Sequence, residues 1–101
     1  MGKFTITSRA REDLKEIGRY TKRIWGRAKR IEYLDLLRSR MRDLADGKLS
    51  GRKCFGIPGV PWSSHIDRHV IFYRPTSSRD EIEILRVLYD GMDFPRHFEP
   101  N

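Results

Sequence analysis

Hydrophobic and polar residues follow a strand-like pattern in two stretches of the C-terminal half, His69–Arg74 and Glu81–Tyr89. Both stretches are rich in β-branched and aromatic residues, which favour strands, and Pro75–Asp80 between them has the composition of a turn. We therefore expect an antiparallel β-hairpin with strands near 69–74 and 81–89. Neither face of this hairpin is plainly polar, so the sheet should be covered on both sides at its centre.

Strict alternation divides the side chains of each strand between two faces. The first strand is expected to carry Val70 and Phe72 on one face, and His69, Ile71 and Tyr73 on the other. The second strand is expected to carry Ile82, Ile84 and Leu88 on one face, and Leu85, Val87 and Tyr89 on the other.

Two amphipathic helices are predicted ahead of the hairpin. Ser8 can cap the first helix, with Glu12 and Asp13 favoured by the positive end of its dipole, and Gly26 after Trp25 ends it. The second helix runs from about Ala28 to Ala45. Apolar residues at helical spacing form one stripe on each helix, and these stripes should cover one face of the sheet: Ala10, Leu14, Ile17, Thr21 and Ile24, then Ile31, Leu34, Leu37, Met41 and Leu44.

Shorter elements complete the predicted fold. Lys3–Thr7 and Trp62–Ile66 are expected to be strands, and the glycine- and proline-rich stretch Lys48–Pro61 a loop. The residues after Tyr89 can form a short helical turn over the second face of the sheet. The order is β-α-α-β-β-β, which predicts a single α+β domain over residues 1–101, with an antiparallel helical hairpin packed on a mainly antiparallel sheet.

Composition narrows the class of protein. A chain of 101 residues with 38% hydrophobic and 35% charged residues fits one small domain with a heavily charged surface. No apolar run approaches the length of a membrane span, and the N-terminus lacks the apolar segment of a signal peptide, so neither a membrane nor export is expected. Cys54 is the only cysteine, which excludes an internal disulfide and a thiolate-rich zinc site. The cytoplasm is the natural setting.

The positive charge is concentrated ahead of the predicted β-hairpin. The formal net charge is +7, and residues 1–50 hold all of the excess (14 basic minus 7 acidic, against 7 of each in residues 51–101). The segment from Lys22 to Arg30 contains five cations and no acid. Such a surface would attract an acidic partner or nucleic acid; a solvated helical face is the alternative interpretation.

The sequence contains no phosphate-binding loop, no dinucleotide-binding glycine fingerprint and no nucleophile-elbow motif. Its three histidines, His65, His69 and His97, lack the spacing of metal ligands on one helix, so neither a metal nor a cofactor is expected.

One group of residues on the two long strands has the chemistry to cleave RNA through its 2′-hydroxyl, because it offers a proton acceptor, a proton donor and cations. Its members are His69, Tyr73, Arg74, Arg86 and Tyr89. Alternation, however, puts the two arginines on the face opposite the other three. In the alternative interpretation the histidine and tyrosines border the core and the arginines pair with nearby acids.

The chain as a whole resembles a known toxin family. The likeness rests on Trp25-Gly26, Pro58-Gly59, the strand His69-Val-Ile-Phe-Tyr-Arg74 and the ending Ile82-Glu-Ile-Leu-Arg-Val-Leu-Tyr-Asp-Gly-Met-Asp93. From about Phe4 to Arg96 the sequence resembles the ParE toxins, which belong to the RelE/ParE superfamily of bacterial toxin–antitoxin toxins. The family usually has His where this chain has Tyr89.

The resemblance implies a β-α-α-β-β-β fold, in agreement with the pattern above, and a cytoplasmic toxin that inhibits DNA gyrase without being an enzyme. It also implies a ParD-like ribbon-helix-helix antitoxin whose C-terminal segment wraps the toxin, with operator DNA bound only through that antitoxin. Two alternatives stay open: a ribosome-dependent messenger RNA endonuclease of the RelE type, and an inactive homologue that only binds antitoxin. Asp90-Gly91 after Tyr89, continuing into Met92-Asp93, is similar to the ParE branch.

The resemblance also directs the choice of site residues. For a gyrase inhibitor the candidates for target contact lie on the last strand, its neighbour and the tail: His69, Tyr73, Arg74, Arg86, Tyr89, Asp93 and Arg96. Asp93 has an alternative role as the side-chain cap of the terminal turn. For antitoxin contact the candidates are Tyr20, Trp25 and Tyr33 of the helical hairpin, each of which could instead fill the core. An acidic antitoxin segment that folds on binding would neutralise the excess charge.

Overall fold

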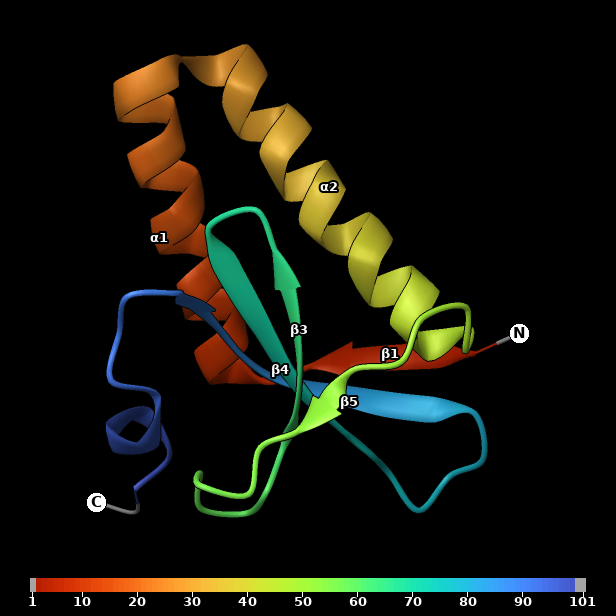
Figure 1. The fold of residues 1–101 in the computed structure, drawn as a ribbon. Helices are drawn as coiled ribbons and strands as arrows, with labels where there is room; N and C mark the ends of the chain where they lie inside the picture. The colour runs from red at the N-terminus through yellow and green to blue at the C-terminus, as the bar shows by residue number, and fades with distance from the viewer. Residues whose placement is uncertain (1, 100–101) are drawn as a thin grey trace.

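The computed structural model describes residues 2–99, and over this range the chain forms two α-helices, one five-stranded sheet and a short 3-10 helix near the C-terminus (Figure 1). The helices are α1 (Ser8–Trp25) and α2 (Arg27–Ala45), and the 3-10 helix is η1 (Phe94–Phe98). The strands are β1 (Lys3–Ile6), β2 (Arg52–Lys53), β3 (Trp62–Ile66), β4 (His69–Pro75) and β5 (Glu81–Tyr89). The predicted α+β fold is confirmed, with β2 as an addition inside the expected loop.

The strand order in the sheet is β1-β5-β4-β3-β2, and β1 runs parallel to β5 while the other neighbouring pairs are antiparallel. The parallel pair arises because the helical hairpin carries the chain across the sheet between β1 and the later strands. β1 pairs with β5 only from Lys3 opposite Glu81 to Ile6 opposite Ile84. β5 continues to Tyr89, so its last five residues extend beyond the end of β1.

The sheet has a hydrophobic core on each face, as predicted. The core on the helix side joins both helices to the sheet, and its buried members include Ala10, Ile17, Leu37, Met41, Leu44, Ile71, Tyr73, Ile84 and Val87. The core on the other side is smaller: Ile57, Val70, Phe72 and Leu88 are buried there, with Phe94 and Phe98 packed against them. Both of these tail rings lie edge-on to Phe72, with ring centroids 5.1 Å away. The predicted helical turn over the second face is therefore η1.

The predicted facing of β5 is wrong beyond Ile84, because a β-bulge interrupts its pairing with β4. Phe72 pairs with Arg86 and Tyr73 with Ile84, so Leu85 is an extra residue on β5. One extra residue inverts the alternation that follows it. As a result Val87 joins Ile84 in the helix-side core, whereas Leu88 lies in the opposite core.

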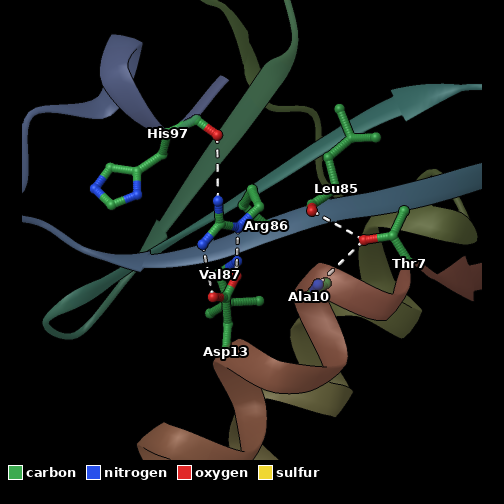
Figure 2. A network of polar contacts seen from close by, with 7 residues as sticks. All are labelled: Thr7, Ala10, Asp13, Leu85, Arg86, Val87 and His97. Carbon is green, nitrogen blue, oxygen red and sulfur yellow. Dashed lines mark hydrogen bonds and ion pairs between the residues drawn. The ribbon is translucent and has the colours of Figure 1, made fainter. Parts of the chain in front are cut away.

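The first helix is capped by Thr7 and not by the predicted Ser8. The Thr7 side chain accepts a hydrogen bond from the Ala10 amide (3.1 Å) while its backbone remains extended. The Thr7 hydroxyl also donates to the Leu85 carbonyl (3.0 Å), which is possible because Thr7 directly follows β1 beside β5 (Figure 2). The extra bond to the sheet explains why the cap falls one residue earlier than the sequence predicts.

The helices are joined by Gly26 alone and extend past the sheet. Figure 1 shows them rising away from the strands to this joint. We call residues 22–32 the hairpin tip; every residue in it is exposed. Ile24 and Ile31 are 50% and 53% exposed, so the prediction that they belong to the core is wrong. Neither described helix is both long and apolar enough to cross a membrane.

Gly26→Ala is expected to lower the free energy of unfolding by about 1–3 kcal/mol. Gly26 has φ 95° and ψ 172°, a region that residues with a side chain rarely adopt. No atom lies within 4 Å of an added methyl group, so the cost is one of backbone conformation. Urea unfolding followed by circular dichroism measures it. Gly56→Ala is the matched control, because an added methyl group there also meets no atom within 4 Å and its φ is not positive. Equal stability of both variants would contradict the prediction.

Candidate functional site

Three aromatic side chains from separate elements meet where β4 begins and β5 ends. His69, the first residue of β4, pairs with Tyr89, the last residue of β5, and their rings lie edge to face with centroids 6.0 Å apart. From α2, the Tyr33 hydroxyl lies 2.6 Å from Nδ1 of His69. We call Tyr33, His69 and Tyr89 the aromatic cluster. The structure thus unites two residues predicted for target contact with one predicted for antitoxin contact.

The electrostatics of the aromatic cluster favour uncharged groups. Burial lowers the pKa of the His69 imidazole, against the opposing charges of Asp67 and Asp90. Burial, followed by the negative charge of Asp67, raises the pKa of Tyr33 to about 12. At neutral pH the phenol therefore keeps its proton and can donate it in a hydrogen bond to an unprotonated Nδ1 of His69. The cluster is a neutral, hydrogen-bonded junction between α2 and the sheet.

A part-buried ion pair joins α1 to the bulged part of β5. Asp13 accepts two hydrogen bonds from the Arg86 guanidinium, one from Nε (2.8 Å) and one from Nη2 (2.9 Å). The same carboxylate accepts a third bond from the Val87 amide (2.9 Å), and Arg86 Nη1 donates to the His97 carbonyl (3.2 Å), as Figure 2 shows. The Arg86 and Asp13 side chains are only 16% and 11% exposed. The ion pair therefore joins the side chains of Asp13 and Arg86 to the backbone amide of Val87 and the backbone carbonyl of His97.

The Asp13 carboxylate also completes the sheet. β1 ends at Ile6, so the β5 residues beyond Ile84 have no strand beside them on that edge. Thr7 satisfies the Leu85 carbonyl there and Asp13 satisfies the Val87 amide. The hydrogen bonds that Arg86 donates to Asp13 raise the pKa of Arg86, which keeps the guanidinium charged. Arg86 accordingly positions the tail over the far side of the sheet through His97.

Other residues predicted for target contact lie at the opposite end of β4. Tyr73 is buried, stacks on Trp62 with ring centroids 6.5 Å apart, and accepts a hydrogen bond from the Gly51 amide (2.8 Å). Arg74 is exposed and pairs with Glu83, with Nη2 2.9 Å from the carboxylate. Five residues of extended chain, roughly 16 Å, separate His69 from Arg74.

Asp93 and Arg96 lie exposed on the tail, before and within η1. Asp93 occupies the N-cap position of η1 but makes no side-chain capping hydrogen bond, so its predicted alternative role as a side-chain cap is wrong. The proline at the start of η1 removes one amide that a cap would otherwise satisfy. The Asp93 carboxylate is therefore available to a partner.

The residues required for RNA cleavage do not converge. His69 and Tyr89 are adjacent, but Arg74 lies at the far end of β4 and Arg86 is held by Asp13. The five residues predicted for RNA cleavage therefore share no common point of attack on a phosphate, although the positive charge of Arg68 lies close enough to act on Tyr33. Within residues 2–99, no group of three or more His, Cys, Asp or Glu side chains has the arrangement to hold a metal ion.

A groove of about 410 Å³ runs along α2 toward β1. We call it the hairpin groove. Its apolar lining comes from Ile6, Leu14, Ile31, Leu34 and Met41. Three arginines, Arg27, Arg30 and Arg38, line it together with Asp35. The groove combines an apolar floor with excess positive charge, which suits an acidic, amphipathic segment.

The two remaining candidates for antitoxin contact lie on α1, and neither lines this groove. Tyr20 is 56% exposed, with the Arg23 guanidinium 5.6 Å from its ring centroid, and Trp25 is 68% exposed at the end of the helix. Neither fills the core, which was the alternative for both. Tyr33 differs, because its hydroxyl is engaged by His69.

Sequence reasoning missed Asp13 and the groove arginines as site residues. Asp13 was assigned to the helix dipole, although its position three residues after Ala10 and four before Ile17 places it beside the buried face of α1. That spacing was the available signal for a buried partner of Arg86. For the groove, Arg27, Arg30 and Arg38 fall at spacings of three and eight along α2, which could have indicated one basic strip.

Comparisons with known proteins agree with this geometry. The family described as "ParE toxin of type II toxin-antitoxin system, parDE" matches residues 4–94. A solved structure titled "Chromosomal ParDE TA system from P. aeruginosa" has a chain of similar fold, with a TM-score of 0.72 and 20% sequence identity over 88% of this chain and 95% of that one. No individual curated protein matches the sequence.

Asp13→Asn is expected to lower the free energy of unfolding by about 1–3 kcal/mol, because it leaves the part-buried Arg86 guanidinium without its counterion. Urea unfolding followed by circular dichroism measures the loss. Glu12→Gln is the control, since Glu12 neighbours Asp13 but its side chain is 65% exposed; its effect should stay within about 0.5 kcal/mol. Similar stability of the two variants would show that the ion pair contributes little.

Folding stability is expected to decrease as the pH falls below about 6.5, the ordinary pKa of histidine. Because burial lowers the pKa of His69 in the folded chain, the unfolded chain binds that proton more readily. The stability is thus fully present above the unfolded pKa and is lost as the pH falls toward the folded one.

The measurement is urea unfolding across a pH series. His69→Asn should flatten the dependence, because the amide oxygen can accept the Tyr33 hydrogen bond without titrating. His65→Asn, at an exposed position on β3, is the control that should keep the slope of the parent protein. An unchanged slope in His69→Asn would exclude His69 as its source.

Proposed function

We propose that this chain, which belongs to the ParE toxin family of type II toxin–antitoxin systems, inhibits DNA gyrase by direct protein contact and is neutralised by a ParD-like antitoxin. The proposal places the toxin in the cytoplasm, where gyrase acts. Operator DNA is bound only through the antitoxin. The family match over residues 4–94 is the observation that carries the proposal.

The geometry supports contact over catalysis. The two arginines predicted for RNA cleavage are paired away from His69 and Tyr89, Arg74 with Glu83 and Arg86 with Asp13. Burial also lowers the pKa of His69, and its Nδ1 is occupied by the Tyr33 hydroxyl. The aromatic cluster therefore stabilises the fold where a general base would have to be free.

The proposed target surface lies where β5 passes into the tail. Tyr89 and Met92 are 44% and 43% exposed there, and Asp93 and Arg96 are exposed beside them. Arg86 supports this surface from beneath, because it holds the His97 carbonyl and so fixes η1. In this proposal Tyr89, Asp93 and Arg96 contact the target, while His69 and Arg86 position them.

The proposed antitoxin surface is the hairpin groove together with the exposed side chains of Tyr20 and Trp25 on α1. Arg27 and Arg38 stand eleven residues apart on α2, which corresponds to about 16 Å of helix. An antitoxin segment of about three helical turns, with acids facing the arginines and apolar residues facing Leu14 and Leu34, would fill the groove. Such a segment would cover apolar surface that the sheet leaves open.

Purified toxin is expected to abolish supercoiling by gyrase, with accumulation of cleaved DNA, and to leave messenger RNA on programmed ribosomes intact. Tyr89→Ala with Arg96→Ala should weaken the inhibition at least about tenfold, since exposed aromatic and arginine residues dominate contact energies. Arg9→Ala with Arg79→Ala, two exposed arginines distant in sequence from the tail, is the control. Messenger cleavage with unaffected gyrase would overturn the proposal in favour of a nuclease.

Charge reversal in the groove is expected to weaken antitoxin binding. Arg27→Glu with Arg38→Glu should raise the Kd at least about tenfold, because like charges then face the acidic segment. Calorimetry over a salt series measures the affinity, which should fall with increasing salt in the parent toxin. Arg9→Glu with Arg79→Glu changes the net charge equally and should have a smaller effect. Salt-independent binding would remove the electrostatic basis of the proposed surface.

A further inference from the structure

The hairpin tip concentrates positive charge at a projecting end of the molecule. Residues 22–32 contain Lys22, Arg23, Arg27, Lys29 and Arg30 against the single acid Glu32. All of these residues are exposed. Trp25 lies among them and is 68% exposed, which makes it the most exposed tryptophan or tyrosine of the described chain.

Most of these cations form no ion pair with the part of the chain that the structure describes. Across residues 2–99 the tip makes one ion pair, between Lys29 and Glu32 at 3.5 Å, and both side chains are more than half exposed. Arg27, Lys29 and Arg30 stand in the first turn of α2, which contains no acid and follows Gly26 without a side-chain cap. Cations at that end oppose the helix dipole. Their density therefore indicates a role in binding an anionic partner.

The side chains of the hairpin tip are of the types that bind a series of phosphate groups. Arg23 and Arg27 carry guanidinium groups, which bind phosphate oxygens in pairs, and they flank Trp25. An exposed indole between them can stack on a sugar or base. We propose that the hairpin tip binds the phosphodiester backbone of nucleic acid, independently of base sequence. The proposal goes beyond the gyrase and antitoxin contacts and requires neither of them.

The same observations disfavour a second copy of this chain and a lipid bilayer as the partner of the hairpin tip. A second copy of this chain carries the same net charge of +7 and would bring like-charged tips together. A lipid bilayer would have to admit Ile24 and Trp25, but Arg23 and Arg27 lie within one or two residues of them. Insertion would draw those charges toward the hydrocarbon at high cost. Binding to phosphates in water carries no such penalty.

The test measures fluorescence anisotropy of a labelled duplex DNA of about 20 base pairs, titrated with the full chain over a salt series. We expect saturable binding that weakens with salt, with a logarithmic slope of about −3 to −4 for three or four phosphates neutralised. Unlabelled DNA duplexes of two unrelated base sequences serve as competitors. Equal competition is expected for recognition of the backbone, whereas preference for one base sequence would overturn the proposal.

The decisive variant is Lys22→Ala with Arg23→Ala and Lys29→Ala, which leaves the hairpin groove intact because none of the three lines it. Its affinity should fall at least about tenfold and its salt slope should become shallower by about 2 to 3. Arg9→Ala with Lys48→Ala and Arg79→Ala removes the same charge from exposed positions elsewhere and should lower the affinity less than about threefold. Equal losses in the two variants would overturn the assignment to the tip.

Trp25→Phe provides a second readout. The chain has two tryptophans, and Trp62 stacks on Tyr73, so quenching of tryptophan emission by DNA should come from Trp25 and disappear in the variant. Absence of DNA binding at low salt, or binding to anionic vesicles in preference to DNA, would overturn the proposal. Circular dichroism checks that each variant is folded. Because no gyrase is present, failure here leaves the gyrase proposal untouched.

Discussion

The ion pair between Asp13 and Arg86 fixes how α1, β5 and the tail are placed relative to one another. It links α1 to β5, satisfies the Val87 amide where β1 no longer covers the edge of the sheet, and reaches the tail through the His97 carbonyl. Each of these groups would otherwise be an unpaired polar atom close to the core, which is costly. The bulge at Leu85 belongs to the same arrangement, because it turns Val87 toward the helices. The two hydrophobic cores lie on opposite faces of β5, and this ion pair is the polar link between the elements that cover them.

The two helices bury apolar side chains where they lie on the sheet and expose them where they extend past it. Near the sheet, the helices bury apolar residues such as Leu37 and Met41; beyond it, the same helical stripes run on through Ile24 and Ile31 into solvent. The exposed continuation is surrounded by cations, so it is suited to partners and contributes little to the core. Tyr89 and the tail form the remaining proposed surface, and Tyr89 lies beside His69, which the Tyr33 hydroxyl contacts one residue beyond the hairpin tip. The proposed antitoxin and nucleic-acid surfaces share Trp25, Arg27 and Arg30, whereas the proposed target surface includes none of these residues.

Much of the fold follows from local sequence patterns. Both helices, the β4–β5 hairpin, β3 and the terminal turn over Phe72 were predictable from spacing and turn composition. The errors share a physical cause, which is contact between residues distant in sequence. Thr7 replaces Ser8 as the cap because β5 lies beside it, and the bulge at Leu85 has no signature in the alternation. Ile24 and Ile31 have the periodicity of core residues, but periodicity contains no information on where the sheet ends. For the candidate site, the pattern brought out His69 and Tyr89 but not Asp13, whose partner is 73 residues away.

The parallel pairing of β1 with β5 also governs the order in which the protein can be completed during synthesis. Lys3 lies opposite Glu81, so β1 can pair only after β5, the last strand in the sequence, has been synthesised. Until β5 has left the ribosome, neither the pairing of β1 nor the hydrogen bond from Thr7 to the Leu85 carbonyl can form, and Asp13 lacks its partner Arg86. The helical hairpin, built from local contacts, can form early, whereas the sheet beneath it closes late. The nascent chain therefore displays the hairpin before it possesses the tail surface, and a partner that recognises the hairpin can engage the chain before the toxin is finished.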